Sequence, residues 1–112
     1  MSRRMQKVAA LLKREISVLV NDYIPKEIGI VSITDVELTS DFKDAKVYIS
    51  FLDKSKENEI FEILDQKKAE FQKILGKKLT IKFTPRIRFV VDNYQEKIDK
   101  VEKLLEEINN GS

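Results

Sequence analysis

Between Leu79 and Phe89, apolar and polar residues alternate without a break, and this pattern constrains the fold more than any other feature of the chain. Successive side chains of a β-strand point to opposite faces, so the alternation predicts a long strand from Leu79 to Val91. The polar face contains no carboxylate, and we therefore expect its positive charge to meet solvent or an anion. The apolar face is predicted to hold Leu79, Ile81, Phe83, Pro85, Ile87, Phe89 and Val91, and the polar face Thr80, Lys82, Thr84, Arg86 and Arg88.

The length and composition limit the classes of protein to which the chain can belong. Its 112 residues suit one domain, and we expect residues 1–112 to share a single core. The sequence has no cysteine and no histidine, which excludes disulfides, thiolate nucleophiles, imidazole bases and the usual zinc ligands. No apolar run approaches the ~20 residues of a membrane-spanning helix, and no signal segment is evident. We therefore expect a cytoplasmic protein without a membrane anchor.

Positive and negative residues occupy different parts of the chain. Residues 1–14 hold five Lys or Arg and no acid, and residues 66–91 hold eight Lys or Arg and one acid. The segments between and after them are acidic, although the net charge of the whole chain is only +2. Two basic segments separated by acidic ones predict a molecule with one positive side. The alternative is that the lysines are solvated residues that keep the protein soluble.

Two amphipathic helices are predicted before the long strand. Apolar residues recur every three or four positions in residues 3–23, where Ser2 can act as the N-cap. A second helix is predicted to begin near Asp53 and to run to Leu75. Gly76 is expected to end this helix, because glycine is the preferred residue just after a helix C-terminus.

A β-hairpin is predicted between these two helices. Residues 30–39 and 45–51 have strand-like sequences, and the polar residues between them are typical of a turn. The apolar alternation of the first strand changes parity after Ile33. We therefore expect a β-bulge near Thr34 and Asp35.

A last helix is predicted between Asn93 and Gly111, which completes the order helix, strand, strand, helix, strand, helix. This order predicts an α+β fold in which a three-stranded sheet carries the helices on one face. The other face of the sheet is expected to stay open. The apolar stripe of the last helix consists of Ile98, Val101, Leu104, Leu105 and Ile108, and the basic and aromatic residues expected on the open sheet face are Tyr48, Lys82, Arg86 and Arg88.

The apolar stripe of the second helix is interrupted at Lys67 and Lys68. Two adjacent lysines on a core-facing line indicate either that their aliphatic stems reach past the core to solvent or that the helix bends. We expect a bend at this point.

The basic residues of the second helix and of the strand after it predict a nucleic-acid surface, because contacts between Lys or Arg and phosphates dominate affinity for RNA and DNA. Binding through the RNA backbone is favoured over stacking, since Tyr48 is the one clear aromatic candidate for the open face. The carboxylate pairs lie in polar stretches, so we expect neither catalysis nor a metal or other cofactor. The predicted RNA-binding residues are Lys67, Lys68, Lys73, Lys77, Lys78, Lys82, Arg86 and Arg88, extended by Arg3, Arg4 and Lys7 of the first helix.

Residues 31–51 and 75–92 resemble the ribosome-binding factor A family of bacterial RNA-binding proteins. The most specific elements of the resemblance in the hairpin are Asp41 and the run Ala45-Lys46-Val47-Tyr48. In the second segment, the residues that occur at the spacing of the family are Leu75, Gly76, Pro85, Phe89 and Asp92. The resemblance implies a type II K-homology (KH) fold with the order α-β-β-α(kink)α-β-α. In the family, an Ala-x-Gly sequence marks the kink, whereas this chain has Lys67, Lys68 and Ala69 there.

The resemblance also implies a function. It predicts a non-enzymatic factor that binds 16S rRNA and the free 30S ribosomal subunit, assists maturation of the 5′ end of 16S rRNA, and matters especially in the cold. A ribosomal protein is a further possible partner, and we expect the factor to be a monomer. Three alternatives stay open: a protein-interaction module that uses the last helix and the open sheet, a ribosome binder that silences translation, and an enzyme acting on RNA.

Overall fold

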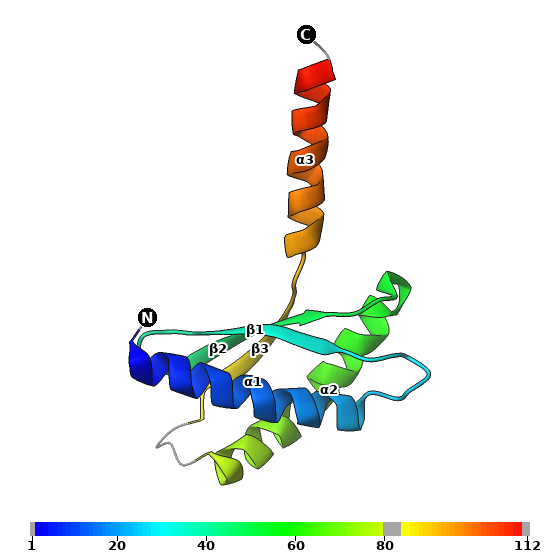
Figure 1. Cartoon of the computed structure of the whole chain (residues 1–112). Helices are drawn as coiled ribbons and strands as arrows, with labels where there is room; N and C mark the ends of the chain where they lie inside the picture. The colour runs from blue at the N-terminus through cyan, green and yellow to red at the C-terminus, as the bar shows by residue number, and fades with distance from the viewer. Residues whose placement is uncertain (1, 80–83, 111–112) are drawn as a thin grey trace.

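The computed structural model describes residues 2–79 and 84–110 of the chain (Figure 1). The elements follow the predicted order of helix, two strands, helix, strand and helix, with a short 3₁₀ turn, η1, before the second helix. They are α1 (Arg3–Tyr23), β1 (Ser32–Leu38), β2 (Asp44–Ser50), η1 (Lys54–Lys56), α2 (Glu57–Lys78), β3 (Arg86–Val91) and α3 (Tyr94–Asn110). The predicted α+β fold is therefore confirmed.

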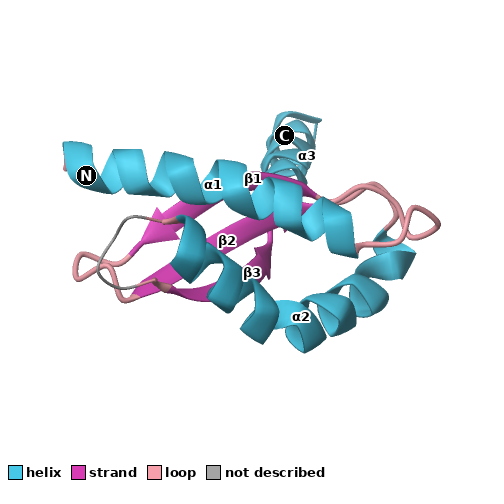
Figure 2. Cartoon of the chain, turned by 90° about the horizontal axis from the view of Figure 1, so that it is seen from below, coloured by secondary structure: helices cyan, strands magenta, loops and turns pink. Residues whose placement is uncertain are grey.

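The three strands form one sheet in the order β1-β2-β3. β1 and β2 are antiparallel, whereas β2 and β3 are parallel, so α2 serves as the crossover between them. Figure 2 shows α1 and α2 side by side over one face of the sheet. The expectation that all helices share this face is wrong for α3, which projects from the opposite side of the sheet (Figure 1).

The β1–β2 hairpin has the β-bulge and the polar turn that the sequence predicts. The register shifts between Ile33 and Asp35, where the β-bulge is predicted. In the turn, Phe42 has a φ of 62°, a left-handed conformation that is uncommon outside glycine. The Asp41 carboxylate stabilises this turn, because it accepts hydrogen bonds from Thr39 Oγ1 at 2.7 Å and from the backbone N–H of Lys43 at 3.0 Å.

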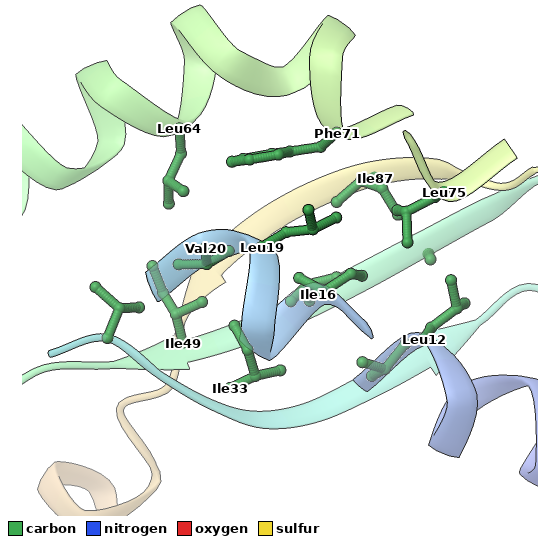
Figure 3. Close-up of a cluster of buried hydrophobic side chains, with 14 of the residues drawn as sticks. Leu12, Ile16, Leu19, Val20, Ile33, Ile49, Leu64, Phe71, Leu75 and Ile87 are labelled. Carbon is green, nitrogen blue, oxygen red and sulfur yellow. The ribbon is translucent and has the colours of Figure 1, made fainter. Parts of the chain in front are cut away.

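The core lies between the sheet and the two helices that cover it. Side chains from α1, α2 and all three strands converge in Figure 3, where the labelled residues include Leu12, Ile33 and Phe71. Leu12, Val20, Val47 and Leu64 are each 0% exposed. Each Å² of apolar surface removed from water contributes about 25 cal/mol to the free energy of folding, so this layer is the main source of stability. No described polar or charged residue is buried in it.

The C-terminal end of α2 differs from the prediction. The helix continues through Gly76 to Lys78, because Phe71, Leu75 and Leu79 are spaced four residues apart and all three are buried. The backbone N–H of Leu79 still donates to the carbonyl of Leu75 at 2.8 Å. The role assigned to Gly76 is also wrong: a Cβ atom there would lie 3.2 Å from Thr84 Oγ1, so the glycine permits close packing.

The strand after α2 is shorter than predicted. β3 begins at Arg86, and the preceding Thr84 and Pro85 are not in a strand. Leu79 belongs to the end of α2, so a strand starting there is wrong, and residues 80–83 lie outside the described residues. Within β3 the alternation is confirmed at its start, where Ile87 is buried between exposed Arg86 and Arg88.

The middle of α2 is helical throughout, but the helix bends there. The helix is not interrupted at Lys67 or Lys68. Its axis nevertheless changes direction near the middle of the helix (Figure 2). The expected bend is therefore accommodated within a continuous helix, without a glycine.

Candidate nucleic-acid interface

A shallow groove separates α2 from β3, the edge strand of the sheet. Cationic and aromatic side chains from residues 61–68 of α2 and residues 86–89 of β3 meet here. Two carboxylates also line the groove, so its charge is mixed but positive overall. The lining residues are Phe61, Asp65 and Lys68 of α2, Asp44 of β2, and Arg86, Ile87, Arg88 and Phe89 of β3.

Gln72 of α2 fixes the position of β3 beside this groove. Its side-chain amide donates a hydrogen bond from Nε2 to the carbonyl of Pro85, and its Oε1 accepts one from the N–H of Ile87 at 3.3 Å. The two bonds occupy backbone groups on the free edge of the sheet, which would otherwise lack a partner strand. Because they bracket Arg86, they also set how this part of β3 presents its side chains.

Arg86 is partly neutralised, contrary to expectation. Its Nε lies 3.0 Å from Asp44 Oδ1, since the two residues are opposite each other in the β2–β3 register. The prediction from sequence considered only charges within the strand, and the carboxylate comes from its neighbour. Lys68 and Arg88 form no ion pair within the described part of the chain, so they are the freest cations of the groove.

Lys67 faces the other helix. Its Nζ lies 5.6 Å from the centre of the Tyr23 ring, and it also lies 3.8 Å from Glu70 Oε1. The Tyr23 ring in turn packs edge-on against Phe71. A hydrogen bond to the Glu70 carboxylate raises the pKa of the Tyr23 hydroxyl, because it favours the protonated form. These contacts explain the lysine in the apolar stripe, and they separate Lys67 from the groove lined by Lys68.

The other predicted cations gather at the hairpin end of the molecule. The first turn of α1, the β1–β2 turn and the last turn of α2 lie toward this end (Figure 2). The Arg4 guanidinium lies 5.3 Å from the ring of Phe42 in the hairpin turn. Lys78 Nζ lies 3.4 Å from Glu15 Oε2 of α1. Arg3, Lys7, Lys73 and Lys77 are also exposed, whereas Lys82 lies outside the described residues.

The opposite end of the molecule, where α1 ends and α2 begins, carries more acids than bases. This separation of charge is the arrangement that the two basic sequence segments predict. The bases at that end are Lys26, Lys54 and Lys56. The acids there are Asp22, Glu27, Asp53, Glu57, Glu59 and Glu62.

The open sheet face is less basic than expected. Asp35 and Glu37 of β1 are exposed on it. The Tyr48 hydroxyl donates to Glu37 Oε2 at 3.0 Å, and this bond raises the pKa of the tyrosine. Tyr48 is therefore engaged with its neighbouring strand. Sequence reasoning missed Phe61 and the partial exposure of Phe89; the one available signal was that Phe61 lies off the apolar stripe of α2.

Metal sites and membrane-spanning helices are not found in the described parts of the molecule. In residues 2–79 and 84–110, no cluster of three or more His, Cys, Asp or Glu side chains is arranged to hold a metal ion. None of the described helices has the length and apolar character needed to cross a membrane.

The chain matches a known protein family. The family description "Ribosome-binding factor A" matches residues 4–105. The chain is 36% identical over 111 residues to ribosome-binding factor A of Chlorobium phaeobacteroides, covering 96% of both chains. It is 35% identical over 112 residues to that of Moorella thermoacetica, covering 96% of this chain and 92% of the relative.

Solved structures show the same fold. The crystal structure of ribosome-binding factor A from Thermus thermophilus superposes with a TM-score of 0.66 at 17% identity, covering 78% of this chain and 94% of the other. A Thermus thermophilus homology model fitted into the cryo-EM map of a 30S complex gives 0.64 at 17% identity, covering 76% and 91%. The NMR structure of a Thermotoga maritima relative gives 0.56 at 30% identity, covering 77% and 80%. The chain described here thus belongs to the ribosome-binding factor A family.

Proposed function

We propose that this protein is a non-enzymatic assembly factor that binds 16S rRNA on the free 30S ribosomal subunit in the cytoplasm. In this proposal it assists maturation of the 5′ end of 16S rRNA and of the subunit, particularly in the cold. Lys68 and Arg88 line the two sides of the groove without an ion pair to any described residue, and this observation carries the proposal in a chain of this family. Such cations can neutralise phosphates without first breaking an internal ion pair.

The arrangement supports a specific mode of binding. The RNA backbone would follow the groove, with Lys68 and Arg88 contacting phosphates and the hairpin end extending the contact. Phe61 and Phe89 also line the groove, where an unpaired base can stack on an aromatic ring. The acidic end would face away from the RNA. Binding of this kind changes the rRNA only if one rRNA conformer is bound more tightly than another.

A salt titration tests the RNA interface. With about six phosphate contacts, affinity for 16S rRNA fragments should fall with salt on a log–log slope of about 4 to 5. The combined variant Lys68→Ala, Lys77→Ala and Arg88→Ala should lower that slope by about 2 to 3 and leave the Tm nearly unchanged. Lys100→Ala with Lys103→Ala, on the projecting helix, is the matched control and should keep the wild-type slope. An unchanged slope in the triple variant would refute the interface.

The non-enzymatic character has its own test. Precursor 16S rRNA incubated with the purified protein alone should remain uncleaved, whereas the same precursor on 30S particles should be processed faster by cellular nucleases when the protein is present. Cleavage by the protein alone would replace the assembly-factor proposal with the enzyme alternative.

A further inference from the structure

The apolar stripe of α3 is unusual in this molecule because it is exposed. Val101, Leu104, Leu105 and Ile108 are between 54% and 67% exposed. The other exposed large apolar residues that the structure describes, Val18, Ile30 and Leu52, belong to three separate segments. Contiguous apolar patches of this kind mark interaction surfaces more often than isolated apolar residues do.

The body of the molecule offers no surface that could cover this stripe. α3 projects from the open side of the sheet (Figure 1). That open face exposes charged side chains such as Glu37, Lys46 and Arg88, which would lose hydration beneath an apolar helix. The inner face of the sheet is already covered by α1 and α2 (Figure 2). Among the described residues, the most extensive exposed apolar surface that a copy of this chain offers to α3 is therefore another α3.

The spacing of the stripe is that of a two-stranded coiled coil. In the sequence, Ile98, Val101, Leu105 and Ile108 are separated by three, four and three residues, the a and d positions of a heptad. Leu104 widens the stripe on one side. The four a and d positions span 11 residues, fewer than two full heptads, so this short seam suits a weak and reversible association rather than an obligate dimer.

The charges beside the stripe select the orientation of the pair. Glu102 stands at an e position of this heptad, directly beside the stripe. Glu102 is also the midpoint of Tyr94–Asn110. An antiparallel pair in full overlap would therefore bring the two Glu102 side chains together, which costs free energy through like-charge repulsion.

We propose that α3 is a self-association helix, through which two copies of this protein form a weak parallel dimer with their basic grooves held apart on separate bodies. This departs from the monomer expected from the sequence, and it does not depend on the proposed function in RNA binding. In a two-fold pair of this kind the same stripe of each copy contacts its counterpart.

Sedimentation equilibrium of the 112-residue chain from about 10 µM to about 1 mM, without RNA, should show a concentration-dependent shift from monomer toward dimer. Leu105→Glu, which places a charge in the stripe, should raise the dissociation constant by about tenfold or more without changing the Tm measured in dilute solution. Lys103→Glu is the matched control on the outer side of the helix and should leave the association unchanged. A wild-type protein that remains monomeric at about 1 mM would overturn the proposal.

Cross-linking tests the orientation, because the chain has no native cysteine. Ile108→Cys should form a disulfide-linked dimer under mild oxidation, since two d positions face each other only in the parallel pair. Lys103→Cys should cross-link much more slowly. Equal rates for the two variants would indicate random collision and overturn the proposal. So would a monomeric protein whose Leu105→Glu variant loses binding to purified 30S subunits, because the stripe would then contact the ribosome.

Discussion

α1 and α3 have similar sequence patterns, but their apolar stripes have different environments in the structure. Both are amphipathic helices with an apolar stripe. The stripe of α1 contains Leu12 at 0% exposure, whereas the stripe of α3 contains Ile108 at 67%. An apolar stripe therefore indicates the need for an apolar partner without identifying it. α1 finds that partner in the inner face of the sheet, whereas α3 projects away from the open side of the sheet (Figure 1).

The largest change in stability tests whether the packed layer alone holds the fold together. Leu12→Ala should lower the free energy of unfolding by about 2 to 5 kcal/mol, because it leaves a cavity in a fully buried site. Leu105→Ala in α3 should change it by less than about 0.5 kcal/mol in dilute solution. Chemical denaturation of the two variants at low micromolar protein measures both values. A similar loss for both would mean that α3 packs on the body, and the contrast between the helices would disappear.

The next effect concerns how α2 is attached to the sheet. Gln72→Ala removes both side-chain bonds to the edge of β3 and should cost about 1 to 3 kcal/mol, since the Pro85 carbonyl and the Ile87 N–H lose partners in a partly buried place. Gln66→Ala, at an exposed position of the same helix, is the control and should cost almost nothing. Amide hydrogen exchange at Ile87 should accelerate in the first variant only. An unchanged exchange rate at Ile87 would show that β3 does not depend on the two hydrogen bonds from Gln72.

Substitutions of Lys67 and Lys68 in α2 should have opposite effects on stability and on RNA affinity. Lys67→Ala should lower the free energy of unfolding by about 0.5 to 1 kcal/mol, because the contact with the Tyr23 ring is lost, and it should leave RNA affinity nearly intact. Lys68→Ala should leave stability intact and reduce the salt slope of RNA binding by about 1. Thermal unfolding and fluorescence anisotropy with an rRNA fragment measure the pair. Equal losses of RNA affinity would return Lys67 to the interface.

The smallest effect is a pH dependence in the hairpin turn. Hydrogen bonds from Thr39 and from the Lys43 backbone lower the pKa of Asp41. A lowered native pKa contributes stability above the unfolded value of about 4, and this contribution is lost as the pH falls through the native pKa. Asp41→Asn should therefore be less stable than the wild type near pH 7, with the two curves converging in strong acid. Carbon NMR titration of Asp41 provides the pKa directly, and a value at or above the ordinary one would contradict the turn geometry.

Much of the fold could be predicted because local patterns are strong in this chain. The bounds of α1, its Ser2 cap and the bulge after Ile33 depend on periodicity and on residues next to each other in sequence. The exit from α2 could not be predicted in the same way. Phe71, Leu75 and Leu79 continue a helical spacing, but Leu79 also begins the alternation of the strand, and burial of Leu79 against the core decided between the two.

The residue types of the candidate site could be predicted from the sequence, but the contacts between these residues could not. The basic residues near β3 were evident, whereas the pairing of Arg86 with Asp44 depends on strand register. The divergence of Lys67 and Lys68 depends on which neighbour lies on each side of α2. The aromatic lining from Phe61 and Phe89 likewise arises only when α2 is laid beside the edge strand.

The order of elements, the segregation of charge and the family all follow from the amino-acid sequence, because each depends on residue type and on spacing along the chain. Which cations remain free and which apolar stripe remains uncovered became clear only from the packed molecule. Both outcomes depend on distances between segments remote in sequence, since an ion pair or a buried contact forms only where the fold brings its two partners within a few ångströms.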